Sequence, residues 1–284
     1  MNFILSTDLF CDLTPSTLTA NGIHFLSGVA LSGEEILSEP ELAEDFDEIY
    51  ACIKGGEDIK RSELTVADYE QYFDNLFEKN RGDIVHICSS ETDYNKAYKA
   101  SKNEAIKFPR RSVYIVKNGS LSAGTRLALN YADELRRKDY SAEEVFVALN
   151  ELCPKIKTLI AVKDEKKLVE SGLLLKAVDA KAVDATSLFL LNASESNGEK
   201  PFGKAKLLKR SKGEKTAVKK IVEELLSEEN QGSKAYLSAS SETLSVFLYD
   251  ELVKKGFAVD YSQASVSTVC ALGATCTVIA VAVK

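Results

Sequence analysis

The chain has 284 residues and a net charge of −7, and its 45% hydrophobic and 28% charged residues are an ordinary globular balance. The negative charge argues against a protein that binds nucleic acid or an anionic membrane over its whole surface, because both need a cationic field. We expect no signal peptide and no integral membrane association, since the longest apolar run, residues 278–283, is far shorter than a membrane-spanning helix. Six scattered cysteines without a C-x-x-C pair predict a reduced, cytoplasmic protein.

Predicted strands and helices alternate in the first half of the chain. The predicted strands cover residues 2–6, 23–29, 83–88 and 112–116. The predicted helices begin at Thr14, at a capping box over residues 38–41, at Thr65, near Asp93, near Leu121 and at Ser141. Such alternation is typical of a parallel sheet with helices on both faces, a three-layer α/β domain. Ligands of such sheets bind beyond the carboxyl ends of the strands, which points to residues 7–12, 88–93 and 117–124.

The second half has a different pattern. Strands are predicted over residues 158–162, 187–191, 204–208, 235–238, 258–262 and 275–283. Helices are predicted over residues 166–183, 214–226 and 242–255. We expect a compact α+β domain here, so the chain divides into an N-terminal α/β domain, residues 1–154, and a C-terminal domain, residues 155–284.

Two aspartates follow the first predicted strand. Asp8 and Asp12 are placed where some enzymes hold a metal or accept a phosphoryl group. Phosphatases of the haloacid dehalogenase type have their two aspartates two residues apart, whereas these are four apart. A local turn or cap bond is therefore the competing interpretation. With only two histidines in the chain, we expect no metal site and no cofactor.

Other polar groups allow weaker hypotheses. His86 and Cys88 share one face of a predicted strand. They are either a nucleophile pair or simply buried strand residues. Hydroxyls at two predicted strand ends form an anion site or simply cap helices: Ser89, Ser90, Ser120 and Ser122, near Gly124. A cationic run extends from Lys204 to Lys220. It is interpreted either as a docking surface or as a solvated helix face. The apolar residues 266–283 line a lipid tunnel or form a core strand with a turn at Gly273.

Motifs in almost the whole chain resemble those of the DegV family. Thr7-Asp8-Leu9-Phe10-Cys11-Asp12-Leu13 is similar to the family's T-D-S-x-x-D-L, and Lys60-Arg61-Ser62-Glu63-Leu64 stands in the place of K-T-S-Q-P. Ser89-Ser90-Glu91-Thr92-Asp93 resembles the start of S-S-x-L-S-G-T, and residues 117–124 resemble D-S-x-S-x-S-x-G. Residues 168–174 resemble L-x-x-G-G-R-I, and residues 267–274 stand in the place of G-T-H-T-G-P-G-A.

This resemblance implies a two-domain protein that is not an enzyme. It implies that a long-chain fatty acid lies in a buried pocket and that a separate fatty acid kinase phosphorylates its carboxylate. The residues placed at the ligand by the resemblance are Arg61, Ser62, Ser89, Ser90, Asp93, Ser122, Thr268 and Val269.

Three of these positions depart from the family pattern. Arg61 replaces a threonine, Asp93 an inner serine and Val269 a histidine. An ionised Asp93 repels a carboxylate, and Arg61 offsets this repulsion if it forms a bidentate pair with either acid. A binder of a different small or neutral lipid is therefore the alternative, and an aspartate-dependent phosphotransferase is a third hypothesis.

Overall fold

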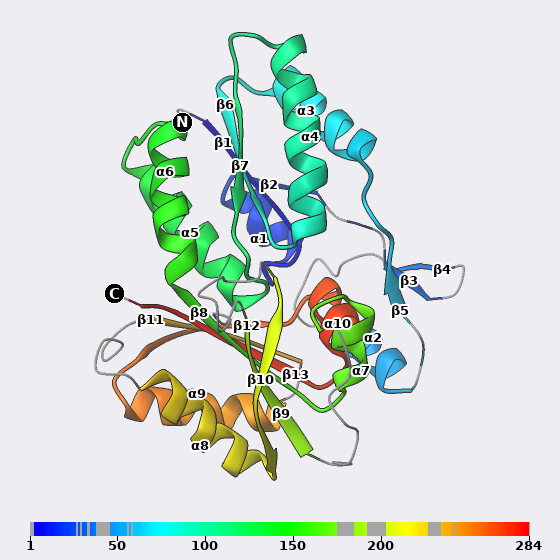
Figure 1. Cartoon of the computed structure of the whole chain (residues 1–284), viewed down its shortest axis with the longest axis vertical. Coiled ribbons are helices and arrows are strands. Elements are labelled where there is room, and N and C mark those ends of the chain that lie inside the picture. Colours follow the sequence, from blue (N-terminus) through cyan, green and yellow to red (C-terminus); the bar gives the residue numbers. More distant parts are fainter. Residues whose placement is uncertain are drawn as a thin grey trace.

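The computed structural model describes residues 3–26, 28, 30–32, 35–37, 46–55, 57, 59–174, 185–191, 203–226, 234–240 and 242–283. These residues form a parallel sheet and a separate mixed sheet, with helices packed on both, and a small third sheet (Figure 1). The predicted fold class, a parallel α/β part followed by an α+β part, is confirmed.

The parallel sheet has the strand order β2-β1-β6-β7. Its strands are β1 Phe3–Asp8, β2 Ile23–Leu26, β6 Asp83–Cys88 and β7 Val113–Lys117. Alternate residues of β1 face opposite sides of the sheet. Ile4 packs with α3 (Val66–Lys79) and α4 (Glu91–Lys107), whereas Leu5 packs with α5 (Ala123–Arg137) and α6 (Ala142–Leu152). The short helix α1, Pro15–Ala20, is capped by Thr14 as predicted.

The mixed sheet has the strand order β10-β9-β8-β13-β11-β12. Its strands are β8 Ile156–Val162, β9 Ala185–Leu191, β10 Ala205–Lys212, β11 Lys234–Ala239, β12 Ala258–Gln263 and β13 Cys276–Ala282. Only β11 and β12 pair in parallel, and the other neighbours are antiparallel. The helices α8 (Glu214–Leu225) and α9 (Glu242–Lys254) cover one face (Figure 1).

Helix α5 lies between the two large sheets (Figure 1). One core cluster joins Leu5 of β1 to Ile160 of β8 and Val278 of β13. Arg126 of α5 is 1% exposed, and its Nη2 donates to the carbonyl oxygens of Leu237 (3.0 Å) and Asp260 (2.7 Å). Because this core is continuous, the division into domains 1–154 and 155–284 stays a prediction; a 3₁₀ turn at Cys153–Lys155 lies at that point.

A third, antiparallel sheet was not predicted. It has the order β4-β3-β5, formed by β3 Ala30–Ser32, β4 Glu35–Leu37 and β5 Ile59–Arg61. Strands of three residues are too short to give a period of two in the sequence. The helix α2 covers Phe46–Lys54, and the capping box predicted at residues 38–41 lies outside the described residues.

Two further expectations were wrong. The helix predicted over residues 166–183 is α7, Glu165–Glu170, and Gly172 follows it with a φ of 72°, a left-handed position that ends helices; residues 175–183 lie outside the described part. The interpretation of residues 266–283 as a core strand with a turn at Gly273 holds only after the turn, where β13 forms, because α10 covers Val266–Leu272 and Ser265 caps it by accepting from the Thr268 amide. Small and β-branched residues in 266–272 hid this helix.

No helix in the described part of the chain is both long and apolar enough to cross a bilayer.

Candidate functional site

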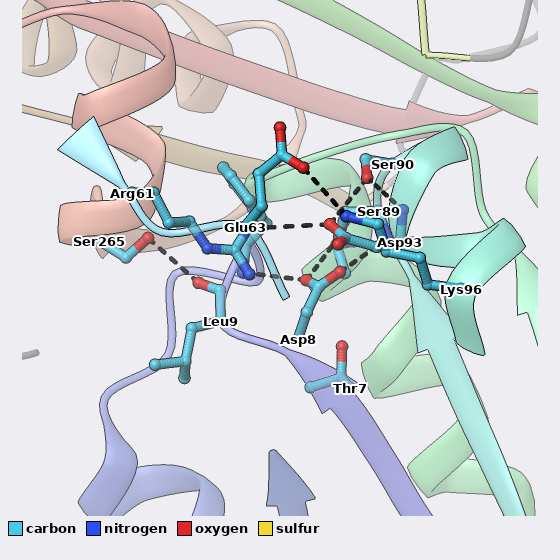
Figure 2. Close-up of polar contacts among 12 residues, drawn as sticks. Thr7, Asp8, Leu9, Arg61, Glu63, Ser89, Ser90, Asp93, Lys96 and Ser265 are labelled. Carbon is cyan, nitrogen blue, oxygen red and sulfur yellow. Dashed lines mark hydrogen bonds and ion pairs between the residues drawn. The ribbon is translucent and has the colours of Figure 1, made fainter. Parts of the chain in front are cut away.

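The carboxyl ends of β1 and β6 meet at Asp8. The buried carboxylate accepts hydrogen bonds from the Ser89 amide (2.9 Å), the Ser89 hydroxyl (2.8 Å) and the Phe10 amide (3.0 Å) (Figure 2). Burial raises the pKa of Asp8, and the nearby Arg61 charge acts in the opposite direction. Two of the segments predicted to carry a ligand site, residues 7–12 and 88–93, therefore lie side by side.

Ser90 and Asp93 form the start of α4. The Ser90 hydroxyl accepts from the Asp93 amide (3.0 Å) and donates to Asp93 Oδ2 (2.7 Å). The Asp93 residue is 9% exposed, so its charge is largely withdrawn from water. The carboxylate is thereby fixed next to the end of β6, close to Asp8 (Figure 2).

The third part of this cluster comes from β5. The Arg61 guanidinium points toward Asp8 and Asp93 (Figure 2), and its Nη1 lies 3.9 Å from Asp93 Oδ2. Arg61 forms no bidentate pair with Asp93, because this contact is single and long, and the buried Nε and Nη2 have no hydrogen-bond partner among the described residues. A bidentate pair of Arg61 with a ligand carboxylate stays a prediction. The Phe10 ring stacks on the guanidinium, 4.6 Å from centroid to Cζ.

Gly28 keeps this arginine in place. A Cβ at position 28 would lie 2.8 Å from Arg61 Nε and 2.6 Å from the Ser62 carbonyl oxygen. Any side chain would therefore collide with the strand that carries Arg61 and Ser62. The glycine explains how a large guanidinium fits at a position where the family has a threonine.

Ser122 and Thr268 lie at a different carboxylate, that of Asp12. The Asp12 Oδ1 accepts from the Ser265 amide (2.8 Å) and the Thr268 hydroxyl (2.7 Å), and Oδ2 accepts from the Ser122 hydroxyl. Both Asp12 (φ 54°) and Ser122 (φ 58°) have positive φ, which is uncommon for residues other than glycine. Asp12 thus joins the loop after β1 to the starts of α5 and α10.

Val269 belongs to neither cluster. It is fully buried in the apolar core that α10 forms with the sheets. The predicted ligand set therefore separates into three parts. Arg61, Ser89, Ser90 and Asp93 lie around Asp8, and these five residues are called the Asp8 cluster below; Ser62 follows Arg61 in the chain, and Ser122 and Thr268 bind Asp12.

The hypotheses of aspartate or cysteine chemistry gain no support from the geometry. The Asp8 and Asp12 oxygens accept hydrogen bonds within the chain, which favours local structural roles. His86 is fully buried, bonds the Ser6 hydroxyl (2.8 Å), and burial lowers its pKa to about 3. Burial also raises the pKa of Cys88, which disfavours the reactive thiolate.

A cavity of about 160 Å³ opens beside the Asp8 cluster. Its wall combines hydroxyls and apolar side chains from both halves of the chain: Phe10, Ser89, Ser90 and Leu121 from the first, and Leu173, Leu191 and Ala271 from the second. Apolar walls with a few placed polar groups are typical of small-molecule sites. This cavity unites residues of the motifs near positions 7–13, 89–95, 117–124, 168–174 and 267–274.

The comparison with protein families agrees with this arrangement. The family model described as "Uncharacterised protein, DegV family" matches residues 3–284. The chain belongs to the DegV family. A search of curated proteins finds no match by sequence.

Solved DegV structures share the whole fold. A DegV lipid-binding protein from Thermotoga maritima superposes with a TM-score of 0.81 at 18% identity, covering 100% of this chain and 99% of its own. A fatty-acid-binding DegV protein from Thermus thermophilus gives 0.82 at 18%, covering 100% of both. The fatty acid kinase (Fak) B3 protein of Streptococcus pneumoniae, loaded with linoleic acid, gives 0.80 at 15%, covering 100% of both. These family members are thus described as binding proteins rather than enzymes.

Two residues beside the Asp8 cluster drew no attention in the sequence analysis. Phe10 covers Arg61 and lines the cavity, and Tyr69 of α3 is fully buried with its ring 5.8 Å from that of His86 on β6. Phe10 lies inside the first motif, so its position in the loop after β1 was a usable signal. Tyr69 was assigned only to the apolar face of its helix, and no sequence pattern distinguishes its hydroxyl end.

Part of the cationic run is engaged within the chain. Arg210 forms a bidentate pair with Glu165 (2.8 and 2.9 Å), and Lys204 Nζ donates to the Gly172 carbonyl oxygen (2.7 Å). Lys206, Lys209 and Lys212 are exposed on β10, an edge strand. Part of the run is therefore structural, and the edge of the mixed sheet carries its exposed cations.

Proposed function

We propose that this DegV protein holds one long-chain fatty acid, with the carboxylate end in the cavity beside Ser89 and Ser90 and the tail between its two halves. The observation that carries the proposal is the composition of the cavity wall. Hydroxyls at the end of β6 face one side, and Leu173, Leu191 and Ala271 supply apolar surface on the other. A chain with one polar end and one apolar end fits such a wall.

The described ligands of structural neighbours support the same class of ligand. The Streptococcus pneumoniae neighbour is loaded with linoleic acid, and a Eubacterium eligens neighbour, at 14% identity and a TM-score of 0.81, with heptadecanoic acid. These similarities extend over 99–100% of this chain. The proposal transfers the ligand class, a fatty acid, to a chain whose head-group residues differ.

The test is organic extraction of the purified protein followed by mass spectrometry. We expect one acyl species in about equimolar amount with the protein, and we expect added fatty acid to exchange with it. No acyl species in the extract, together with no exchange of added fatty acid, would exclude the proposal.

A different small or neutral lipid is the second candidate, and Asp93 is the observation that favours it. A buried carboxylate close to the head group repels a second negative charge. The variant with Asp93→Ser and Val269→His restores the family residues at both positions. If its preferred ligand equals that of the wild type, these residues do not select the ligand and the second candidate loses its basis.

We further propose that the bound carboxylate is presented to a separate fatty acid kinase. The exposed Lys206, Lys209 and Lys212 on the edge strand β10 are the candidate contact, because an acidic partner surface would complement them. Reversing these three charges should weaken kinase docking and leave lipid loading unchanged. Unchanged docking would exclude this surface as the contact.

A further inference from the structure

The polar end of the proposed site has an unequal number of buried charges. Asp8 on β1 and Asp93 on α4 contribute two carboxylates, and Arg61 on β5 contributes one guanidinium (Figure 2). The Asp8 residue is fully buried, and the Asp93 and Arg61 side chains are 12% and 14% exposed. With both acids ionised, this cluster has a net charge of −1 before any ligand enters.

The same cluster contains donors that are not used. Arg61 Nε and Nη2, which lie on one edge of the guanidinium plane, have no hydrogen-bond partner in the described part of the chain. Buried donors without acceptors destabilise the folded chain. A ligand oxygen would satisfy them, so the cluster is suited to accept an oxygen-bearing head group.

Among the described residues, the other cations near this cluster are exposed or pair with other groups. The Lys96 ammonium is 3.2 Å from the exposed Glu63, Lys117 Nζ is exposed over the Tyr94 ring, and Lys60 is exposed on β5. Glu91 and Lys204 line the cavity with opposite charges. The remaining titratable groups near the cluster are neutral or bonded elsewhere: Cys11, Asp12, Tyr69, His86, Cys88 and Tyr94.

We propose that this cluster accepts an acyl ligand only as an electrically neutral addition, so that a fatty acid binds together with one proton. The inference rests on the proposed function and specifies the chemistry of its head-group end. A carboxylate that entered without a proton would give three buried negative charges around one guanidinium. Acyl chains with a neutral polar head group, such as an alcohol, bind the same donors without a proton.

The proton has a defined place in this arrangement. The proton forms one O–H bond on one of the three carboxyl groups, which belong to Asp8, Asp93 and the ligand. The only bond that breaks is the one that held the proton in the buffer acid. Carboxylates that share a site titrate as a group, since like charges raise the proton affinity of one another. Burial raises the pKa of Asp8 most strongly, the Arg61 charge lowers it and the Asp93 charge raises it, and the net direction is upward. The Nε and Nη2 groups of Arg61 then donate to unprotonated oxygens.

Calorimetry measures this proton directly. Dodecanoate and dodecanol are titrated into the delipidated full-length protein in two buffers of different ionisation enthalpy. We expect about one proton taken up per dodecanoate and none per dodecanol, with the dodecanoate Kd rising about tenfold per pH unit above neutrality. Dodecanoate binding without proton uptake would overturn the inference while leaving the proposed function intact. Binding of neither ligand would contradict both.

A matched pair of variants locates the effect. Asp93→Asn removes one carboxylate, so we expect the proton uptake to fall toward zero and dodecanoate to bind about tenfold more tightly in mild alkali. Glu63→Gln removes a nearby carboxylate that is 87% exposed and should change neither quantity. Full proton uptake by the Asp93→Asn variant would show that the charge count of this cluster does not govern binding. Thermal unfolding of both variants confirms that they are folded.

Discussion

The Asp8 carboxylate accepts both the amide and the hydroxyl of Ser89, 81 positions further along the chain, and so fixes the ends of β1 and β6 to each other. We expect Asp8→Ala to lower the free energy of unfolding by about 3 kcal/mol, because it leaves buried donors without an acceptor. Urea unfolding measures this. Asp250→Ala, at an exposed position on α9, should change it by less than about 0.5 kcal/mol. Equal effects of the two variants would contradict the importance of the Asp8–Ser89 bonds.

The buried His86 predicts a loss of stability in acid. Burial lowers its folded-state pKa from 6.5 to about 3, so the unfolded chain binds the proton more tightly. Stability is therefore fully present above the unfolded pKa and falls as the pH drops from 6.5 toward 3, by up to about 1.4 kcal/mol per pH unit. His86→Gln should unfold with a smaller pH dependence over this window. If the difference in unfolding free energy between the wild type and His86→Gln stays constant with pH, the assignment of this pH dependence to His86 is refuted.

Gly124 is placed where no side chain fits. A Cβ there would lie 1.8 Å from Ser120 Oγ and 2.6 Å from Thr158 Oγ1, which are themselves bonded at 2.7 Å. We expect Gly124→Ala to destabilise the protein by about 2–3 kcal/mol, despite the higher helix propensity of alanine. Adding Ser120→Ala should recover part of this loss, since the closest clashing atom is removed. Thermal unfolding of both variants decides, and a neutral Gly124→Ala would exclude this steric account.

The cavity wall predicts how ligand loading can be blocked. Leu173→Trp adds bulk to a wall of the cavity of about 160 Å³, and we expect at least about tenfold weaker fatty acid binding. Leu208→Trp adds the same bulk on β10, at a residue that is 36% exposed and lines no part of this cavity. Fluorescent fatty acid displacement compares the two. Equal loading of both variants would place the ligand elsewhere.

Local signals in the sequence predicted much of the fold. The helix starts predicted at Thr65 and Ser141 both form, each with a capping box, and the strand predicted over residues 83–88 has those bounds. The helix at α10 was missed, because residues 266–272 combine β-branched and small side chains with no helical stripe. The strands β3 to β5 are held by long-range pairing, such as Ala30 with Arg61, which no local pattern reveals.

The site could be predicted only in part. The rule that ligands lie beyond strand ends selected the segments that hold Asp8 and Ser89, which meet beside the cavity; ligand binding there stays a prediction. The bond from Asp12 to Thr268 joins residues 256 positions apart, so the separation of Ser122 and Thr268 from the Asp8 cluster could not be seen. The single contact of Arg61 with Asp93 also depends on Gly28 and Phe10, which approach it only in the folded chain.

A crystal structure of the protein with a bound long-chain fatty acid tests the central claim most directly. We predict one continuous acyl chain between the two halves, with its carboxyl oxygens within hydrogen-bond distance of Ser89 or Ser90 and of the Nε–Nη2 edge of Arg61. An acyl chain whose head group lies away from the end of β6, or a filled cavity without any acyl chain, would contradict it.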